Sequence, residues 1–352
     1  MDNIREIAGS IKNRDRALMK KAQDRLDNLT KPLGSLGRLE EIAKDIVGMT
    51  GKENPILKDK VIFTFAADHG VTEEGISAFP KEVTAQMVCN FLRGGAGINV
   101  LARHSGSRVV VVDIGVAEDL KPASGLAIRK IGRGTKNMAK GPAMTKDEAI
   151  KAIEAGVEIF EEELRKGVDI AGTGDMGIGN TTPSSAIAAV FTGRPVEEIT
   201  GRGTGIDDKG LQNKIKVIKK AIEINRPDRN DAIDVLSKVG GFEIAGLAGM
   251  ILAAASKRVP VIIDGFISGA AALVVYKIEP KTKEYMIASH CSVEKGHRII
   301  LEHLGLKPIL DLNLRLGEGT GAALAMNIVE AAVKIMTEMA TFESAGISEK
   351  KD

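Results

Sequence analysis

The stretch Val61-Ile-Phe-Thr-Phe-Ala-Ala-Asp-His69 decides the fold class. Its apolar run, Val61–Ala66, has the length and composition of a buried strand, and polar residues follow it directly. Similar runs recur along the chain, and helical periodicity separates most of them. They are Val109–Val112 before Asp113, Val168–Ala171 before Asp175, Val261–Ile263 before Asp264, Tyr285–Ala288 before Ser289 and His290, and Ile309–Leu310 before Asp311. This alternation predicts an α/β fold, in which a doubly wound, mainly parallel sheet has helices on both faces.

The polar residues at the ends of these runs indicate where a ligand would bind. The carboxyl ends of parallel strands meet at one edge of a sheet, and open α/β sheets bind ligands in the crevice outside that edge. The alternative is that the polar residues only mark where strands give way to surface loops. Because so many runs end in this way, we expect a single site with a polar rim.

Length and composition exclude several classes of protein. The 352 residues would form one large α/β domain with a smaller attachment, or two domains. Lys and Arg (49) nearly balance Asp and Glu (47), so no overall charge favours nucleic acid or an anionic membrane as a partner. Aromatic residues make up only 3% of the chain. A planar ligand would therefore be held mainly by aliphatic and methionine side chains.

The cysteines and the N-terminal residues bear on the cellular compartment. Two cysteines, Cys89 and Cys291, do not suggest a disulfide framework. The chain begins without the pattern of a signal peptide, and it contains no uncharged apolar run long enough to span a membrane. We therefore expect a cytoplasmic protein.

One carboxylate, Glu318, stands between Gly317 and Gly319, just before a long predicted helix. The glycines allow a tight turn of the backbone and a close approach of a ligand. A carboxylate in this setting suggests a catalytic base. The alternative is that Glu318 only complements the positive end of the helix dipole.

The segment Gly172-Thr-Gly-Asp-Met-Gly-Ile-Gly-Asn-Thr-Thr-Pro-Ser-Ser185 has the features of an anion-binding loop. Thr182 is the predicted N-cap of the following helix and Pro183 its first residue, so free N–H groups would point into a glycine-rich loop that suits phosphate. The motifs for ATP and for NAD are both absent from it. Asp175 would repel a phosphate, and we expect it to face ribose hydroxyls or the reacting centre.

Two further groups of residues were weighed as ligand contacts. Lys214 could supply a positive charge to the same phosphate, although a solvated surface lysine is the alternative. Phe79, Gln86 and Met87 would give a flat apolar wall with one amide, suited to a small aromatic ligand. The alternative for these residues is ordinary packing of a helix against the sheet.

The histidines and serines do not indicate a metal site or a hydrolase. His290, Cys291, His297 and His303 lack the spacing of zinc ligands. No serine lies in a G-x-S-x-G elbow, so a Ser–His–Asp triad is not supported.

Several blocks of this sequence, taken in order, resemble the nicotinate-nucleotide:dimethylbenzimidazole phosphoribosyltransferase family. The resemblance extends from about Ala22 to about Met339. The blocks are Lys31-Pro-Leu-Gly-Ser-Leu-Gly-Arg-Leu-Glu40, Ala67-Asp-His-Gly70, Gly141-Pro-Ala-Met144, Gly179-Asn-Thr-Thr-Pro183, Asp234-Val-Leu-Ser-Lys-Val-Gly-Gly-Phe242, Asp264-Gly-Phe266, Ser289-His290 with Ser292 and Glu294-Lys-Gly296, and Arg315-Leu-Gly-Glu-Gly319.

The resemblance implies a reaction. Members of the family transfer 5-phosphoribose from nicotinate mononucleotide to 5,6-dimethylbenzimidazole, with inversion at the anomeric carbon. The products, α-ribazole 5′-phosphate and nicotinate, belong to the synthesis of the nucleotide loop of cobalamin. Nicotinate leaves as a stable anion, so the resemblance implies neither a metal nor a cofactor.

The resemblance also implies roles for individual residues. Glu318 matches the catalytic glutamate, which accepts the proton that the benzimidazolium loses. Asp175 would stabilise the oxocarbenium character of the ribose as a second catalytic residue, although one well-known form of the family has glutamate there. The nucleotide-binding positions would be Gly177, Gly179, Asn180, Thr181, Thr182, Gly203, Lys214, Asp264 and Ser292. Phe79, Gln86 and Met87 would border the base, which could be dimethylbenzimidazole, another benzimidazole, adenine or a phenolic acceptor.

The family forms homodimers with an α/β core and a smaller helical domain built from both ends of the chain. Here residues 1–50 and 321–342 would form the small domain, residues 56–320 the core, and residues 343–352 a flexible tail. Helices are predicted over Asp15–Leu29 and from the break at Lys31–Gly37 to about Val47, and their apolar stripes need a partner surface.

Two other classes of protein stay open. One is a different phosphoribosyl or nucleoside enzyme on the same scaffold, which would consume a purine in place of a benzimidazole. The other is a regulator that binds a nucleotide without turnover. Fold alone does not decide among these, because one scaffold hosts many functions.

Overall fold

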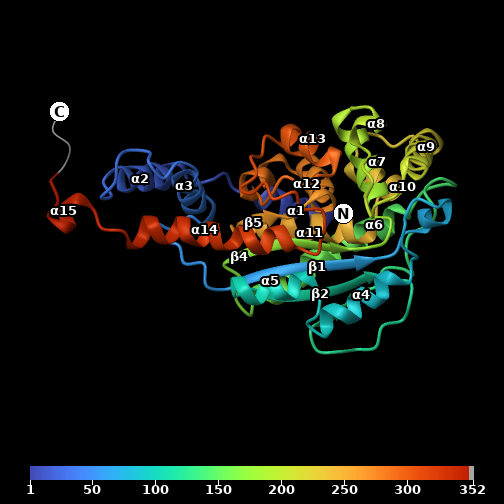
Figure 1. The fold of residues 1–352 in the computed structure, drawn as a ribbon, viewed down its shortest axis with the longest axis horizontal. Helices are drawn as coiled ribbons and strands as arrows, with labels where there is room; N and C mark the ends of the chain where they lie inside the picture. Colours follow the sequence, from blue (N-terminus) through green and yellow to red (C-terminus); the bar gives the residue numbers. More distant parts are fainter. Residues whose placement is uncertain (349–352) are drawn as a thin grey trace.

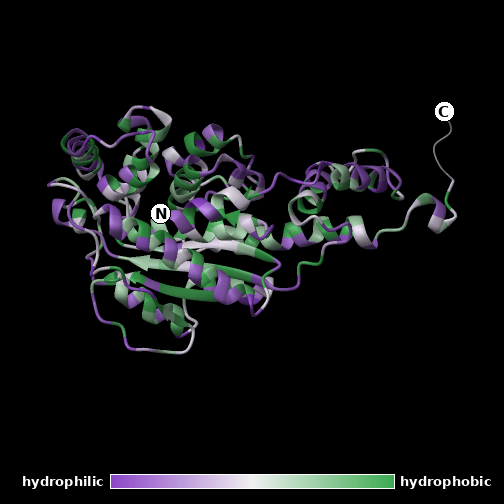
Figure 2. Ribbon diagram, turned by 180° about the vertical axis from the view of Figure 1, so that it is seen from behind, coloured by the Kyte–Doolittle hydropathy of each residue, from purple (hydrophilic) through white to green (hydrophobic). Residues whose placement is uncertain are grey.

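A computed structural model describes residues 1–348 of the protein, and its centre is a six-stranded sheet (Figure 1). All strand pairs are parallel, in the order β3-β2-β1-β4-β5-β6. The strands are β1 (Lys60–Ala67), β2 (Arg108–Gly115), β3 (Leu126–Ile128), β4 (Ile170–Met176), β5 (Val261–Ile263) and β6 (Met286–Ala288). They are hydrophobic over much of their length, as buried parallel strands are (Figure 2).

The path of the chain through the sheet creates a crevice at its carboxyl edge. The chain enters at β1, runs outward through β2 and β3, and returns to β4 on the other side of β1. It then runs outward again through β5 and β6. Adjacent connections leave β1 and β4 in opposite directions, and such switch points are where open α/β sheets bind ligands.

Helices cover both faces of this sheet, so the predicted α/β class is confirmed (Figure 1). Helix α11 (Phe242–Ser256) lies on one face with α12 (Phe266–Ile278), and α6 (Lys146–Leu164) packs on α11. The backbones of α6 and α11 touch, since a Cβ on Gly156 would lie 1.9 Å from the carbonyl oxygen of Gly246. The other face is covered by α4 (Val83–Leu92), α5 (Gly97–Ser105) and α14 (Thr320–Glu338).

The remaining core helices gather near the carboxyl ends of the strands or flank α12. The first set is α7 (Thr181–Thr192), α8 (Val196–Ile199), α9 (Asp208–Asn225) and α10 (Ala232–Val239), which lie together at the right of Figure 1. Helix α13 (Lys295–Leu304) lies beside α12. The chain also forms the short 3₁₀ helices η1 (Gly70–Glu74) and η2 (Pro280–Tyr285). Asp207 and Asp231 cap α9 and α10 by accepting backbone N–H groups.

One strand prediction was wrong and one strand was missed. Ile309–Leu310 is not a strand of the sheet, because only Leu310 pairs, in an isolated bridge with His290. The sixth strand is instead β3, beside β2 at the sheet edge. Its sequence, Leu-Ala-Ile, is apolar but only three residues long, and its residues are partly buried or exposed at the edge of the sheet.

Segments from the two ends of the chain form a lobe that extends away from the sheet (Figure 1). It contains α2 (Arg16–Asp27), α3 (Arg38–Thr50) and the distal part of α14. The Arg25 guanidinium ties α2 to α14 by donating to the carbonyl oxygens of Met336 (2.5 Å) and Thr337 (3.2 Å). Helix α1 (Asp2–Ser10) lies elsewhere, against α11 of the core.

The end of the chain follows this lobe. Residues Phe342–Ala345 form the short helix α15, capped by Thr341. The predicted flexible tail extends to residue 352, and its residues 349–352 lie outside the described part of the chain.

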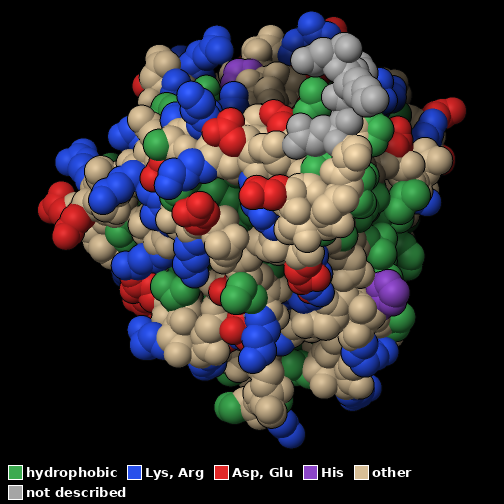
Figure 3. Space-filling view, turned by 90° about the vertical axis from the view of Figure 1, so that its left-hand side faces the viewer, with side chains coloured by type: hydrophobic (Ala, Val, Ile, Leu, Met, Phe, Trp, Pro, Cys, Tyr) green, Lys and Arg blue, Asp and Glu red, His purple; other side chains and the backbone are tan. Residues whose placement is uncertain are grey.

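The surface shows no single-sign charged face on the side of the molecule that Figure 3 displays, where Lys and Arg are interspersed with Asp and Glu. This pattern agrees with the near-zero balance of charge in the sequence. Among residues 1–348, no helix is long and apolar enough to cross a membrane.

Candidate active site

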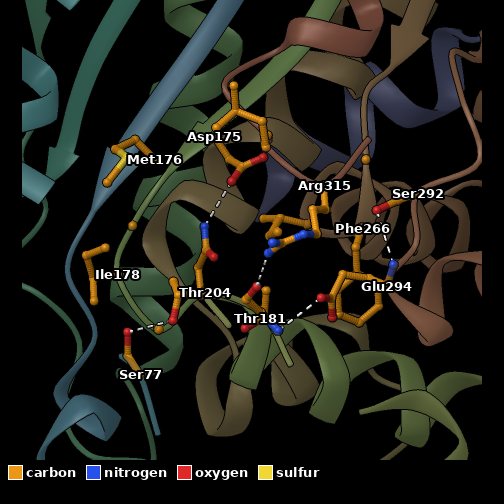
Figure 4. A pocket seen from close by; sticks show the side chains of 18 of the residues that line it. Ser77, Asp175, Met176, Ile178, Thr181, Thr204, Phe266, Ser292, Glu294 and Arg315 are labelled. Carbon is orange, nitrogen blue, oxygen red and sulfur yellow. Dashed lines mark hydrogen bonds between the residues drawn. The ribbon is translucent and has the colours of Figure 1, made fainter. Parts of the chain in front are cut away.

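A cavity of about 420 Å³ opens at the carboxyl edge of the sheet (Figure 4). Segments that follow β1, β4, β5 and β6 line it, together with the loops at Gly203 and Arg315–Gly317. Met176 and Ile178 lie on one side of the cavity, and Ser292 and Glu294 on the other (Figure 4). The site therefore spans the switch point between β1 and β4.

Most of the predicted site residues are in or next to this cavity. Those that line it are Phe79, Asp175, Gly177, Gly179, Asn180, Thr181, Gly203 and Ser292. Thr182, Lys214, Asp264 and Glu318 are buried beside the lining segments. Gln86 and Met87 lie on α4 and are not among the lining residues.

The glycine-rich loop after β4 has the geometry of an anion-binding turn. Gly177 lies against β1, where an added Cβ would be 2.5 Å from the carbonyl oxygen of Ala67. Gly179 has a left-handed φ of 88°. Within residues 1–348, the N–H groups of Gly179 and Thr181 donate to no other group. They are free to bind a phosphate at the start of α7.

The predicted N-cap of α7 was wrong by two positions. The helix begins at Thr181, and the residue before it, Asn180, is the N-cap without a side-chain capping bond. Thr182 is fully buried inside the first turn. Pro183 lies within the first turn, where its missing N–H costs little, so a start two residues earlier satisfies the same local rule.

Lys214 is a buried cation beside this loop, not a solvated surface lysine. Its Nζ donates to Thr181 Oγ1 at 2.6 Å. Burial lowers the pKa of Lys214 to about 8, against the opposing effect of the Glu294 carboxylate. Glu294 itself accepts the Gly203 N–H at 2.9 Å, and the Glu294 N–H donates to Ser292 Oγ at 3.3 Å. A cation and a network of polar groups therefore surround one end of the cavity.

Asp175, at the end of β4, is almost fully buried. One carboxyl oxygen accepts from Asn180 Nδ2 at 3.0 Å, and the other has no hydrogen-bond partner among the described residues. Burial and then the neighbouring Asp264 raise the pKa of Asp175 well above its usual value, while the bond from Asn180 lowers it. Asp175 therefore lines the cavity with one buried carboxyl oxygen that has no partner among the described residues.

Glu318 has a left-handed backbone, with φ of 64° between Gly317 at 86° and Gly319 at 98°. Its own N–H donates to the Asp175 carbonyl oxygen at 3.2 Å, and its carbonyl accepts from Thr64 Oγ1 at 3.0 Å. The carboxylate accepts the Ile98 N–H at 2.9 Å, at the start of α5. Burial raises the pKa of Glu318, and this N–H offsets part of that effect.

The alternative role of Glu318, as a complement to the dipole of the helix that follows it, does not fit this geometry. Its carboxylate contacts the start of α5 and not the start of α14. The start of α14 is served by Asp264, which accepts the N–H groups of Gly319 (3.3 Å) and Ala322 (3.0 Å). Burial raises the pKa of Asp264 to about 7, although those N–H groups oppose the shift. Asp264 therefore holds the turn that presents Glu318.

Several residues of the cavity wall were not predicted as site residues, among them Met176, Arg315 and Leu316. Leu316 and the Glu318 carboxylate meet at Gly97, where an added Cβ would lie 2.9 and 3.3 Å from them. The apolar wall thus continues to the carboxylate. Arg315 donates to the Gly203 carbonyl oxygen at 3.4 Å and adds a cation. Arg315 and Leu316 directly precede Gly317 in the sequence. This position next to Glu318 is the feature from which they could have been predicted as site residues.

Within the described residues, no three His, Cys, Asp or Glu side chains are arranged to hold a metal ion. The groups that the cavity offers are a glycine-rich loop with the geometry of an anion-binding turn, buried carboxylates and an apolar wall. Such a site suits a ligand with a phosphate at one end and a planar apolar group at the other.

A family model described as phosphoribosyltransferase matches residues 11–347. The chain belongs to this family and is therefore a phosphoribosyltransferase, which confirms the resemblance found in the sequence.

Curated relatives and solved structures specify the family member further. A protein from Geobacter sulfurreducens is 60% identical over 335 residues, which are 95% of each chain. One from Desulforudis audaxviator is 58% identical over the full length of both chains. Both are named nicotinate-nucleotide–dimethylbenzimidazole phosphoribosyltransferase. The crystal structure of CobT from Thermus thermophilus is 44% identical, covers 95% of this chain and 100% of its own, and superposes with a TM-score of 0.92.

Proposed function

We propose that this enzyme transfers 5-phosphoribose from nicotinate mononucleotide to 5,6-dimethylbenzimidazole in the synthesis of the cobalamin nucleotide loop. The products are α-ribazole 5′-phosphate and nicotinate. The observation that supports this most is the position of Glu318, a buried carboxylate that directly follows the lining residues Leu316 and Gly317, in a cavity whose loop after β4 suits phosphate. The names of the relatives give the same substrates.

In this proposal the phosphate of the nucleotide binds at the start of α7. The free N–H groups of Gly179 and Thr181 donate to it, and Lys214 supplies the charge next to Thr181. Gly203 and Ser292 border the same end of the cavity. The phosphate thereby fixes the distance of the ribose from the carboxylates.

The reaction breaks the bond between the anomeric carbon and the pyridine nitrogen of nicotinate. The bonding electrons leave with nicotinate and neutralise its ring, while one nitrogen of the benzimidazole forms the new bond from the opposite face. Positive charge develops on the ribose as the old bond weakens. Asp175, whose second oxygen is free, is the carboxylate that would stabilise this charge.

Glu318 completes the reaction by taking a proton. The benzimidazole becomes a cation when one nitrogen attacks, and its other nitrogen then gives its proton to the carboxylate. The raised pKa of Glu318 makes this carboxylate a stronger base than an exposed glutamate. Its left-handed backbone, held by Thr64 and Asp175, fixes the direction of the side chain.

The base would lie on the apolar wall between Phe79 and Leu316. Gln86 and Met87 remain proposed contacts, because their helix α4 directly precedes α5, where the Glu318 carboxylate lies. An apolar wall discriminates weakly between planar rings, so the same wall suits other planar bases as well.

We also propose that the enzyme is a homodimer whose small domain consists of α2, α3 and the distal part of α14. The loop between α2 and α3 is fixed by a buried ion pair of Lys31 and Glu40 (2.9 Å), yet its Leu33 is 75% exposed. Leu312 and the cavity residue Leu316 are also more than half exposed. Apolar side chains on ordered loops favour a contact with a second copy.

Product formation by the purified protein tests the proposed function. The protein is incubated with nicotinate mononucleotide and 5,6-dimethylbenzimidazole without added metal, and the products are separated and identified by mass. We expect α-ribazole 5′-phosphate and nicotinate in equal amounts. Product only with adenine or a phenol would change the acceptor, and binding without product would support the regulator.

A further inference from the structure

His290 lines the same cavity, but the proposed reaction assigns it no role. It is the second residue after β6 and is only 2% exposed. Its ring lies between two glycines: a Cβ on Gly321 would be 2.0 Å from Nδ1, and a Cβ on Gly265 would be 3.7 Å from Nε2. The ring is therefore fixed in position, with Nε2 on the side of Gly265, which also lines the cavity.

The hydrogen bonds of Ser289 determine where the ring proton is. Ser289 Oγ is 2.7 Å from the Asp264 carbonyl oxygen, and a carbonyl oxygen can only accept, so the hydroxyl hydrogen points there. Ser289 Oγ is also 2.9 Å from His290 Nδ1 and must accept in this second bond. Nδ1 therefore carries the hydrogen, and in a neutral ring Nε2 carries a lone pair.

The ring is neutral at ordinary pH. Burial lowers the pKa of His290 to about 4. The nearest aromatic neighbour, His297, is 5.8 Å away between ring centres and is neutral as well, because burial and then His290 lower its pKa to about 3. Within residues 1–348, Nε2 of His290 receives no hydrogen bond. Nε2 of His290 is therefore a hydrogen-bond acceptor in a fixed position, and no donor among the described residues bonds to it.

A nucleotide has few groups that could donate to this nitrogen. Its phosphate is largely a dianion near neutral pH and its nicotinate carboxylate is ionised, so both are acceptors. Only the 2′ and 3′ hydroxyls of the ribose are strong donors. Asp175 is near the end of β4 and His290 comes after β6. Because β5 separates these two strands, the two residues lie roughly 10 Å apart across the edge of the sheet. A ribose fits between them.

We propose that His290 is a specificity-determining residue that accepts a hydrogen bond from a ribose hydroxyl through Nε2, with Ser289 fixing the tautomer. This assignment rests on the proposed function, since it takes nicotinate mononucleotide as the ligand. It gives the site a means to distinguish a ribonucleotide from a deoxynucleotide, because a missing hydroxyl would leave the buried acceptor without a partner.

The test compares dissociation constants for nicotinate mononucleotide and its 2′-deoxy and 3′-deoxy analogues, measured by calorimetry without the base. The wild-type protein should bind at least one analogue about tenfold more weakly than the parent. His290→Asn keeps the hydrogen bond to Ser289 but does not reach the position of Nε2, so it should bind that analogue and the parent within about twofold of each other. The analogue affected identifies the hydroxyl.

His290→Gln is the matched variant, because its amide oxygen can occupy the position of Nε2. It should recover part of the wild-type preference. Equal preference in His290→Asn and wild type would overturn the proposal, as would a Gln variant that loses the preference as fully as the Asn variant. Wild-type protein that binds all three nucleotides equally would overturn it without any variant.

Turnover of nicotinate mononucleotide by the same wild-type sample separates this inference from the proposed function. Normal turnover without a preference for the hydroxyl would overturn the role of His290 alone. A sample that neither binds nor turns over the nucleotide would overturn both.

Discussion

Three carboxyl groups are buried around the cavity, and burial raises the pKa of each of them. Asp175 and Asp264 lie at the ends of adjacent strands, and Glu318 bonds to the carbonyl oxygen of Asp175 through its own N–H. Buried ionisable groups of this kind usually mark functional sites, where they lower stability in return for activity.

The raised pKa of Asp175 predicts a gain in stability when its charge is removed. Because its pKa is higher in the folded state than in the unfolded chain, the folded state loses stability as the pH rises from the unfolded value through the raised one. At pH 7 we expect Asp175→Asn to increase the free energy of unfolding by about 1 kcal/mol or more, and to lower turnover. Denaturant titration and steady-state rates measure both. A less stable variant with the wild-type rate would contradict the role of Asp175.

Lys214 predicts how nucleotide binding depends on pH. Its ammonium group is charged below about pH 8 and neutral above, so the kcat/KM for nicotinate mononucleotide should fall as the pH rises through that value. Lys214→Met should raise KM and remove this limb of the profile. Lys209→Met, on the exposed side of the same helix, is the control and should change neither. If the same fall in kcat/KM with rising pH persists in Lys214→Met, another group and not Lys214 causes it.

For single residues, the sequence predicted which side chains lie at the carboxyl edge of the sheet better than it predicted the direction in which each side chain points. It placed Asp175 and Asp264 together at the carboxyl edge, because strand ends are visible in the pattern. It could not show that Asp264 turns away from the cavity, since the N–H groups that it accepts come from a helix more than fifty residues later. Burial of Lys214 likewise depends on packing between α7 and α9, which no local pattern records.

The element that should be most sensitive to small changes is the loop between β4 and α7. An added Cβ at Gly177 would meet the carbonyl oxygen of Ala67, so Gly177→Ala must displace the loop that precedes the free N–H groups. We expect nucleotide affinity to fall by about tenfold or more, as contacts to charged phosphate are strong. Gly141→Ala, where the added carbon meets nothing within 4 Å, is the matched control. Equal affinity in the two variants would count against this phosphate site.

Element boundaries were predicted to within a few residues for most elements, and the failures fall on two short runs. β1 and α3 agree with their predicted ranges to within a few residues. β3 was missed and Ile309–Leu310 was wrongly included, because each is too short for its pattern to differ from that of a loop. Pairing with β2 at the sheet edge, which is a tertiary contact, stabilises β3.

The proposed dimer belongs to the scale of the whole molecule. If the exposed Leu33 and the lobe around it contact a second copy, the mass in solution should be twice the chain mass of 37.3 kDa. Light scattering or sedimentation at micromolar concentration measures this directly. Leu33→Asp should shift the mass toward the monomer if this loop is part of the contact. A wild-type monomer across that concentration range would contradict the dimer.

The molecule as a whole agrees with its sequence most closely in topology. Alternating strands and helices and the polar strand ends predicted an open parallel sheet with one site at its carboxyl edge, and the sheet has that arrangement. The sequence could not show that the Glu318 carboxylate lies beside the cavity residue Leu316, because this position depends on a tertiary contact of both residues with Gly97 at the start of α5.

The central claim is that Glu318 accepts the proton when phosphoribose is transferred to the base. The most direct test is a single-turnover experiment with enzyme in excess over nicotinate mononucleotide, in which nicotinate release is followed for wild type and Glu318→Gln. We predict that both bind the nucleotide with similar affinity, and that the variant releases nicotinate about a hundredfold or more slowly in the presence of 5,6-dimethylbenzimidazole. Release at the wild-type rate by a Glu318→Gln protein would show that this carboxylate is not the base.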